Sequence, residues 1–246
     1  MATALIERRG IAYVSTVHGL LHVLELAYGV VLVAVAADLG ASMLVLGVLA
    51  NVFGFAYGLT ALPVGILADR ASETRLLAVC AIGMGAAAVG VSVAQGTVML
   101  GVALGFLGVA LGLFHPVASA YIARTATRTG LGFAYLGTGG NLGLALGPIM
   151  VGAIASGLSW RIAYAAFAVP CVILGLLIAR LPNKIRTVAA VADAPPADEP
   201  HEPASRSSSV GLGRLPCSQV DQTGQAFLYA ISSQPSARPA SVCPER

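Results

Sequence analysis

Long apolar runs and short polar connections alternate along the chain as far as Ala179. Six of these runs are long enough to cross a bilayer, which takes roughly 20 residues of helix. Their predicted bounds are Ile11–Ala37, Met43–Ala68, Leu76–Ala94, Val98–Ala123, Leu131–Leu158 and Ile162–Ala179. Because the connections are short, each helix should run antiparallel to the next. The pattern predicts an all-α membrane protein whose six transmembrane helices form one bundle over residues 11–182.

Composition supports a membrane protein. Hydrophobic residues make up 57% of the chain and charged residues only 10%, whereas roughly 25% of a soluble domain is charged. A chain this apolar cannot hide its surface in one aqueous core. The sequence has no GxxxxGK[ST] motif for nucleotide phosphates and no HExxH motif. The four cysteines lack the CxxC spacing of a metal site. We expect no cofactor and no nucleic-acid partner.

The two ends of the chain differ from the middle. Residues 1–10 are polar and form a predicted N-terminal segment ahead of the first span. Beyond residue 182 the chain is rich in Ser and holds most of its 13 prolines, with no further run long enough to span or pack. A segment of this composition cannot bury enough apolar surface to fold. Residues 183–246 are therefore predicted to be a disordered tail.

The basic residues near the ends of the predicted spans fall almost entirely on one side of the bundle. That side holds Arg8, Arg9, Arg70, Arg75, Arg124, Arg128, Arg180, Lys184 and Arg186. The other side holds Arg161. Since loops rich in Lys and Arg stay in the cytoplasm, both ends of the bundle should be cytoplasmic. The prediction is a multi-pass integral protein, placed in the bacterial inner membrane.

The first span carries a polar stripe made of His18, His22 and Glu25. At 100° per residue these side chains share one face of the helix. An ionised group at mid-membrane costs at least about 2.5–3.5 kcal/mol, so such a stripe should face a cavity or a partner. One interpretation is a substrate- or proton-binding face, in which Glu25 and His22 exchange a proton. The other is a neutral Glu25 that bonds to a histidine and holds helices together.

The fourth span contains His115, followed by Pro116. A proline inside a helix removes one backbone donor and leaves a carbonyl free to meet a ligand or water. His115 is therefore a second candidate for the binding site. The alternative is a bend needed only for packing, with the imidazole bonded to a nearby carbonyl.

His18 and His22 also have the i, i+4 spacing of metal ligands on one helix. The Glu that follows the first His of an HExxH motif is absent here, because Gly19 follows His18. From this pair alone we expect no metal site.

The fifth span has a glycine at every fourth position, at Gly139, Gly143 and Gly147, and Pro148 follows. Small residues at this spacing let another helix approach closely, so we expect a packing groove and a hinge, or a surface for self-association. Asn141 on the same helix could reach a cavity as part of the binding site. It could equally bond to a neighbouring helix.

The connection between the second and third spans resembles a known signature. Its Gly65, Leu67, Asp69 and Arg70 match in type and spacing the loop between transmembrane helices 2 and 3 of the major facilitator superfamily. Where that family usually has a second Gly and two basic residues, the next basic residue here is Arg75.

Two other motifs carry the resemblance further. Phe114-His115-Pro116 is similar to the fosmidomycin-resistance, drug-efflux branch, and the glycines before Pro148 are similar to part of the antiporter signature. The resemblance implies the N-terminal six-helix half of such a transporter, built as a 3+3 inverted repeat around a central cavity.

The resemblance implies a secondary transporter, a permease that exports a small molecule or drug with the proton as coupling ion. Expected partners are the lipid bilayer, the substrate, and a second half or a second copy of the chain. The alternative is a non-transporting membrane subunit or a remnant half-transporter, and a truncated or frame-shifted product remains open. We expect no enzyme, because no nucleophile and base pair stands out.

Overall fold

The computed structural model describes residues 2–182, apart from the side chains of residues 2, 3, 61, 62 and 65–70. This part of the chain contains seven α-helices and no strand. They are α1 (Ala2–Leu39), α2 (Met43–Arg70), α3 (Glu73–Ser92), α4 (Thr97–Gly112), α5 (Phe114–Thr125), α6 (Thr129–Gly157) and α7 (Trp160–Ala179). Since α4 and α5 together make one membrane-length segment, the helices provide six spans. The predicted all-α, six-span fold is confirmed, while the predicted tail lies outside the described residues.

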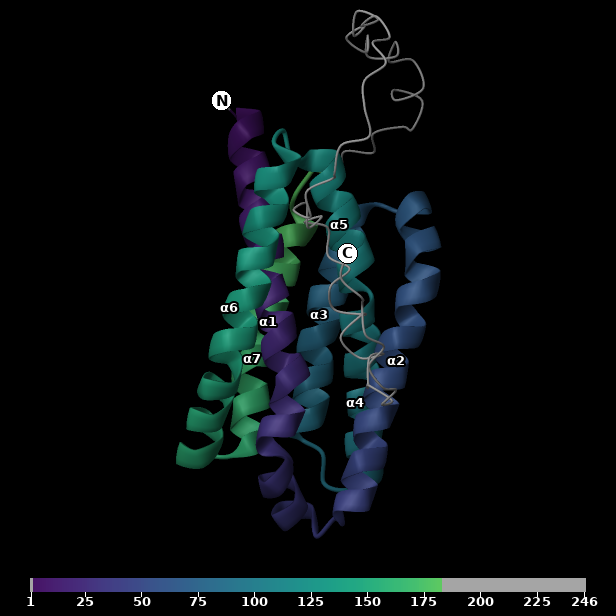
Figure 1. Cartoon of the computed structure of the whole chain (residues 1–246), viewed down its shortest axis with the longest axis vertical. Helices are drawn as coiled ribbons and strands as arrows, with labels where there is room; N and C mark the ends of the chain where they lie inside the picture. The colour runs from purple at the N-terminus through teal and green to yellow at the C-terminus, as the bar shows by residue number, and fades with distance from the viewer. Residues whose placement is uncertain (1, 183–246) are drawn as a thin grey trace, which may run out of the picture. The chain divides into compact units, whose positions relative to one another are not determined.

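The helices pack mainly in three close pairs (Figure 1). α1 packs against α6, α3 against α7, and α2 against α4. α3 also lies along α4, and α1 touches α7, so the pairs join into one bundle. α1 and α2 follow each other in the chain but make few contacts, after a turn at Gly40 with a positive φ of 60°. Most of the α2 segment Met43–Thr60 is left exposed.

The predicted glycine groove of α6 packs against α1 of the same chain. A Cβ on Gly139 would collide with the carbonyl oxygen of Ser15, and one on Gly143 with that of Gly19. Close approach of two helix backbones requires glycine at such points. The expectation that these glycines bring a second copy together is wrong, because α1 already fills the groove.

The other two helix pairs also approach closely at glycines. On α4, a Cβ on Gly108 or Gly112 would collide with the backbone of α2, which includes the carbonyl of Tyr57. Between α3 and α7, a Cβ on Gly85 would lie 2.9 Å from the carbonyl oxygen of Ala168. Without a hydrophobic force between helices in lipid, close van der Waals packing of this kind is what holds spans together.

The ends of two helices differ from the sequence prediction. α1 begins at Ala2 and not at Ile11, because Glu7 ties its first turns to the α5–α6 connection. The Glu7 carboxylate accepts hydrogen bonds of 2.7 Å from the backbone N–H and the hydroxyl of Thr127. α3 begins before the predicted Leu76, because the Ser72 hydroxyl caps its N-terminus. Hydrophobicity marks where lipid begins, and helices continue beyond it.

The fourth span is broken at Leu113, between α4 and α5. Pro116 has no N–H to give to the Gly112 carbonyl, four residues earlier, and it sits in the first turn of α5, where a proline is tolerated. The missing bond separates the two helices and sets the direction of α5.

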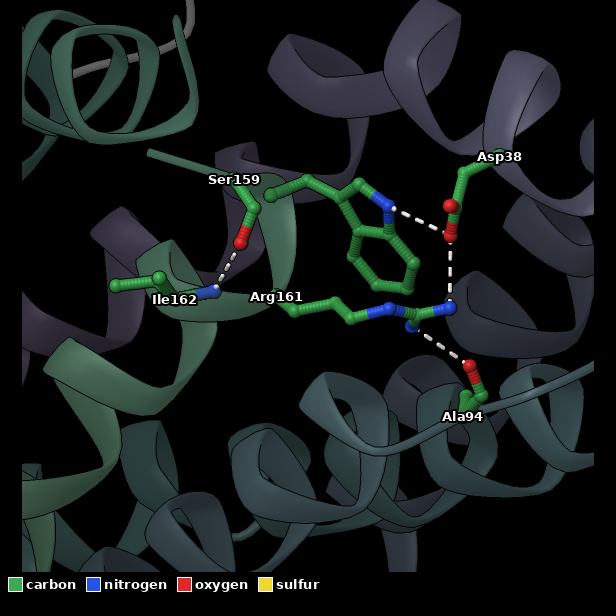
Figure 2. A network of polar contacts seen from close by, with 6 residues as sticks. Asp38, Ala94, Ser159, Arg161 and Ile162 are labelled. Carbon is green, nitrogen blue, oxygen red and sulfur yellow. Dashed lines mark hydrogen bonds and ion pairs between the residues drawn. The ribbon is translucent and has the colours of Figure 1, made fainter. Parts of the chain in front are cut away.

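Polar contacts gather at both ends of the bundle. At the end that holds the first turn of α1, Glu73 of α3 forms an ion pair with Arg124 of α5. At the opposite end, the Arg161 guanidinium donates hydrogen bonds of 2.7 Å to the Asp38 carboxylate and to the Ala94 carbonyl (Figure 2). The Trp160 indole N–H reaches the same carboxylate at 3.3 Å. These contacts join the ends of α1, α3 and α7.

The family-like connection after α2 is described only in part. α2 continues to Arg70, but the side chains of Gly65, Leu67, Asp69 and Arg70 lie outside the described part of the structure. Arg75 lies in the first turn of α3 with an exposed side chain, and its backbone N–H donates to the Ser72 hydroxyl at 3.4 Å.

Candidate histidine and carboxylate site

The polar stripe of α1 lies near the middle of its span, which covers Ala4–Leu39. Within the stripe, His18, His22 and Glu25 form a continuous chain of hydrogen bonds. The Nε2 atoms of the two histidines are 3.1 Å apart, and Nδ1 of His22 lies 2.7 Å from a carboxylate oxygen of Glu25. At the other end of the chain, Nδ1 of His18 lies 2.8 Å from the carbonyl oxygen of Leu136 on α6.

The carbonyl of Leu136 fixes the hydrogen positions in this chain. A carbonyl oxygen can only accept, so Nδ1 of His18 carries a hydrogen and Nε2 of a neutral ring presents a lone pair. His22 must then donate from Nε2. Its Nδ1 atom either accepts from a protonated Glu25 or donates to an ionised one. The two forms contain the same number of hydrogens. They differ only in whether the hydrogen between Glu25 and His22 is bonded to the carboxylate oxygen or to Nδ1.

His115 of α5 joins the pair from the other side. Its ring centre lies 5.0 Å from that of His18, in an edge-to-face arrangement, and 5.9 Å from that of His22. One ring nitrogen from each of the three histidines can be chosen so that all lie within 4.8 Å of one another. Two helices that are distant in sequence therefore bring three imidazoles and a carboxylate together.

Neighbouring residues that the sequence analysis did not propose for the binding site also shape it. The Phe114 ring stacks on the His18 ring at 5.3 Å between centres, and the Tyr57 ring of α2 lies 6.4 Å from that of His115. Gly140 of α6 leaves room for the His18 ring, since a Cβ there would lie 2.7 Å from Nδ1 of that ring. Periodicity along one helix could not have shown these contacts, because each one joins different helices.

Asn141 is not joined to the cluster by any contact within the described residues. Its side chain is exposed on α6. Thr138, one turn earlier, is also exposed and donates to the carbonyl of Ala134 in its own helix. The role of Asn141 in binding remains a prediction.

The cluster is partly open. The side chain of His22 is 15% exposed and that of Glu25 is 27% exposed, so both can be reached from outside the bundle. A separate cavity of about 780 Å³ lies between the first turns of α1 and α6, next to Glu7 and Arg128. It extends as far as Ser15, about one turn before His18. The hydroxyl of Ser15 is buried and has no hydrogen-bond partner among the described residues.

Comparison with known proteins places the chain within a family. A sequence model described as Major Facilitator Superfamily matches residues 15–234. The chain belongs to the major facilitator superfamily. The match includes every residue of the cluster and continues beyond residue 182, the predicted end of the six-helix bundle.

A solved superfamily structure shows the same fold. The chain is similar to a bacterial homolog of the human lysosomal transporter Spinster, crystallised in an inward-facing and unoccupied conformation, with a TM-score of 0.61 and 16% identity. The alignment covers 70% of this chain and 42% of that chain, so this chain spans less than half the length of that transporter. A comparison with curated proteins gave no match. The fold and the family are those of a multi-pass integral membrane protein.

Proposed function

We propose that this chain is the six-helix unit of a secondary transporter, a permease that moves a small polar or amphiphilic molecule across the membrane. The observation that carries the proposal is the meeting of His18, His22, Glu25 and His115 near mid-span. Ionisable groups at this depth are costly, and they generally mark solute or proton pathways. Members of the superfamily handle small-molecule substrates within the membrane, which agrees with a site at this depth.

Proton coupling is the second part of the proposal. The contact between His22 and Glu25 holds one hydrogen that can reside on either side chain. A solute that changes the surroundings of Glu25 would shift that hydrogen, and this would link solute movement to a proton gradient. Efflux of a drug-like compound, as in the fosmidomycin-resistance branch, is the first direction to test.

The distribution of basic residues supports a placement in the cell. Arg8, Arg9, Arg75, Arg124, Arg128 and Arg180 share one end of the bundle, and Arg161 lies at the other. The positive-inside rule then favours a bacterial inner membrane with both ends of the bundle in the cytoplasm. Reaction of single cysteines at Arg75 and Arg161 with an impermeant reagent, in intact cells and in inverted vesicles, tests the orientation.

A second candidate is a non-transporting subunit or a half-transporter that needs a partner half. The observation in its favour is the exposed apolar surface of α2 together with the 42% coverage of the Spinster homolog. A partner half, or a second copy of the chain, would cover that surface.

Reconstitution separates the two candidates. The chain is placed in proteoliposomes with and without a co-expressed C-terminal half of a superfamily transporter, and proton-coupled uptake and efflux of a drug panel are measured. Solute movement in either assembly supports the transporter. If no solute moves in any assembly, the subunit is favoured.

A further inference from the structure

We propose that His18, His22 and His115 form a binding site for one divalent first-row transition-metal ion, of the class of Zn²⁺, Co²⁺ and Ni²⁺. The sequence expectation of no metal considered only the i, i+4 pair on α1. The structure adds a third imidazole from α5, and one ring nitrogen from each of the three lies within 4.8 Å of the other two. The inference concerns the ligand of the site described above. It rests on the proposed function only in taking that cluster to be a binding site.

The spacing of the first two ligands is close to that of a metal site. Zinc binds imidazole nitrogen at about 2.0–2.1 Å, so two nitrogens at a tetrahedral angle lie roughly 3.3 Å apart. The Nε2 atoms of His18 and His22 are 3.1 Å apart. They need to separate by only a few tenths of an ångström. The hydrogen between them then leaves as a proton, as is usual when imidazole becomes a ligand.

The partners of the Nδ1 atoms give the site its second feature. Metal-binding histidines almost always donate their other ring N–H to a carbonyl or a carboxylate, which orients the ring. Here Nδ1 of His18 is held by the Leu136 carbonyl at 2.8 Å, and Nδ1 of His22 by Glu25 at 2.7 Å. Once the hydrogen between the two rings has left and Glu25 is ionised, both Nε2 lone pairs point into the space that the two rings share.

The third ligand lies close but is not yet aligned. His115 makes no hydrogen bond within the described part of the chain, so turning its ring toward the pair breaks none there. Three imidazoles without a charged first ligand suit zinc, cobalt or nickel, whereas magnesium and calcium prefer oxygen. The fourth position is left for water or for a donor atom of a solute.

Cobalt absorption measures this site directly. The full chain is purified with a non-histidine tag, stripped of metal and titrated with Co²⁺, whose tetrahedral complexes absorb visible light intensely. We expect one equivalent of Co²⁺ to bind, with displacement by Zn²⁺ and not by Mg²⁺. His115→Phe keeps an aromatic ring in place and should weaken binding at least about tenfold, and Glu25→Gln should weaken it by about 10–100-fold.

Two further variants separate a lost ligand from a damaged fold. His115→Cys supplies another zinc ligand and should bind metal much better than His115→Phe. His201→Ala removes the fourth histidine of the sequence, which is not one of the three proposed ligands, and should bind as the parent chain does. Absence of the cobalt absorption, or equal affinity in His115→Phe, His115→Cys and the parent chain, would overturn the metal site.

The outcome is independent of transport. Metal binding without solute movement leaves this inference standing and counts against the proposed transporter. Transport by a chain that binds no cobalt leaves the transporter standing and removes the metal.

Discussion

The Nε2 atoms of His18 and His22 lie 3.1 Å apart, one turn from each other on α1. Two lone pairs cannot face each other at this distance, so a hydrogen or a cation must lie between them. The Leu136 carbonyl at one end and Glu25 at the other decide which nitrogen carries a hydrogen. The proposed role of this span in solute or ion movement therefore depends on what occupies the position between the two rings.

Gly140→Ala should damage the site while leaving the bundle folded. The new Cβ would lie 2.7 Å from Nδ1 of His18, and a side-chain ring can move away at little cost. His18 would then lose its contacts with Leu136 and His22. We expect cobalt binding and transport to fall about tenfold or more, with a thermal unfolding midpoint near that of the parent chain. Gly137→Ala, whose Cβ meets nothing within 4 Å, is the matched control and should change neither quantity.

Gly143→Ala should destabilise the bundle itself. Its Cβ would collide with the backbone carbonyl of Gly19, which no side-chain rotation can relieve. Overpacking of this kind typically lowers the free energy of unfolding by about 1–3 kcal/mol. Thermal unfolding in detergent, followed by circular dichroism, should show a lower midpoint than Gly137→Ala. Equal midpoints for the two variants would mean that α1 and α6 are not in backbone contact.

The Arg161 network should contribute to stability at the end of the bundle opposite the first turn of α1. The guanidinium, 4.2 Å above the Trp160 ring, bonds to Asp38 and to the Ala94 carbonyl. Its side chain is 33% exposed, so the ion pair is screened by water and the loss in Arg161→Gln should be about 1–2 kcal/mol.

Asp38→Asn should cost less than Arg161→Gln, because the amide oxygen can still accept from both partners. Arg180 is an exposed cation at the other end of α7, and Arg180→Gln serves as the control in thermal unfolding. If Arg161→Gln unfolds at the same temperature as Arg180→Gln, the Arg161 contacts drawn in Figure 2 contribute nothing measurable.

Pro116→Ala should join α4 to α5. The new amide N–H can bond to the Gly112 carbonyl, and the break at Leu113 would close. The straightened helix should carry His115 away from His18, so metal binding should weaken although stability is kept or raised. A spin-label distance between α4 and α5 would report the straightening. Pro170→Ala in α7 is the matched control. If the helix straightens and metal binding is unchanged, the position of His115 does not depend on the break at Leu113.

The fold was predictable because each span is decided locally. A membrane span must be helical and predominantly apolar over a fixed length, so the six runs show the spans directly. The helix ends were less predictable. Glu7 extends α1 by bonding to Thr127, and Ser72 starts α3 by capping it. Neither contact can be seen in the hydrophobicity pattern of the sequence.

The site was predictable only in part, because sequence spacing describes one helix at a time and not the contacts between helices. The stripe on α1 is a property of one helix, and its period brought out His18, His22 and Glu25. The meeting with His115 depends on how α5 is directed after the break at Leu113. The space for His18 depends on Gly140, which the sequence analysis did not distinguish from the packing glycines around it. Asn141 was proposed from its position on the fifth span. Its side chain is exposed and contacts no residue of the cluster within the described part of the chain.

The central claim is the proposal that one site couples solute movement to proton movement. That site is formed by His18, His22, Glu25 and His115. Its most direct test is proton-coupled solute flux in proteoliposomes of the assembled transporter, compared among Glu25→Gln, His115→Phe and the exposed control Thr138→Ala, at equal amounts of inserted protein. We expect both cluster variants to lose at least about 90% of the flux, because general acid–base groups typically contribute 10²-fold or more, and the control to retain it. Flux at the parent rate in Glu25→Gln and His115→Phe would contradict the account.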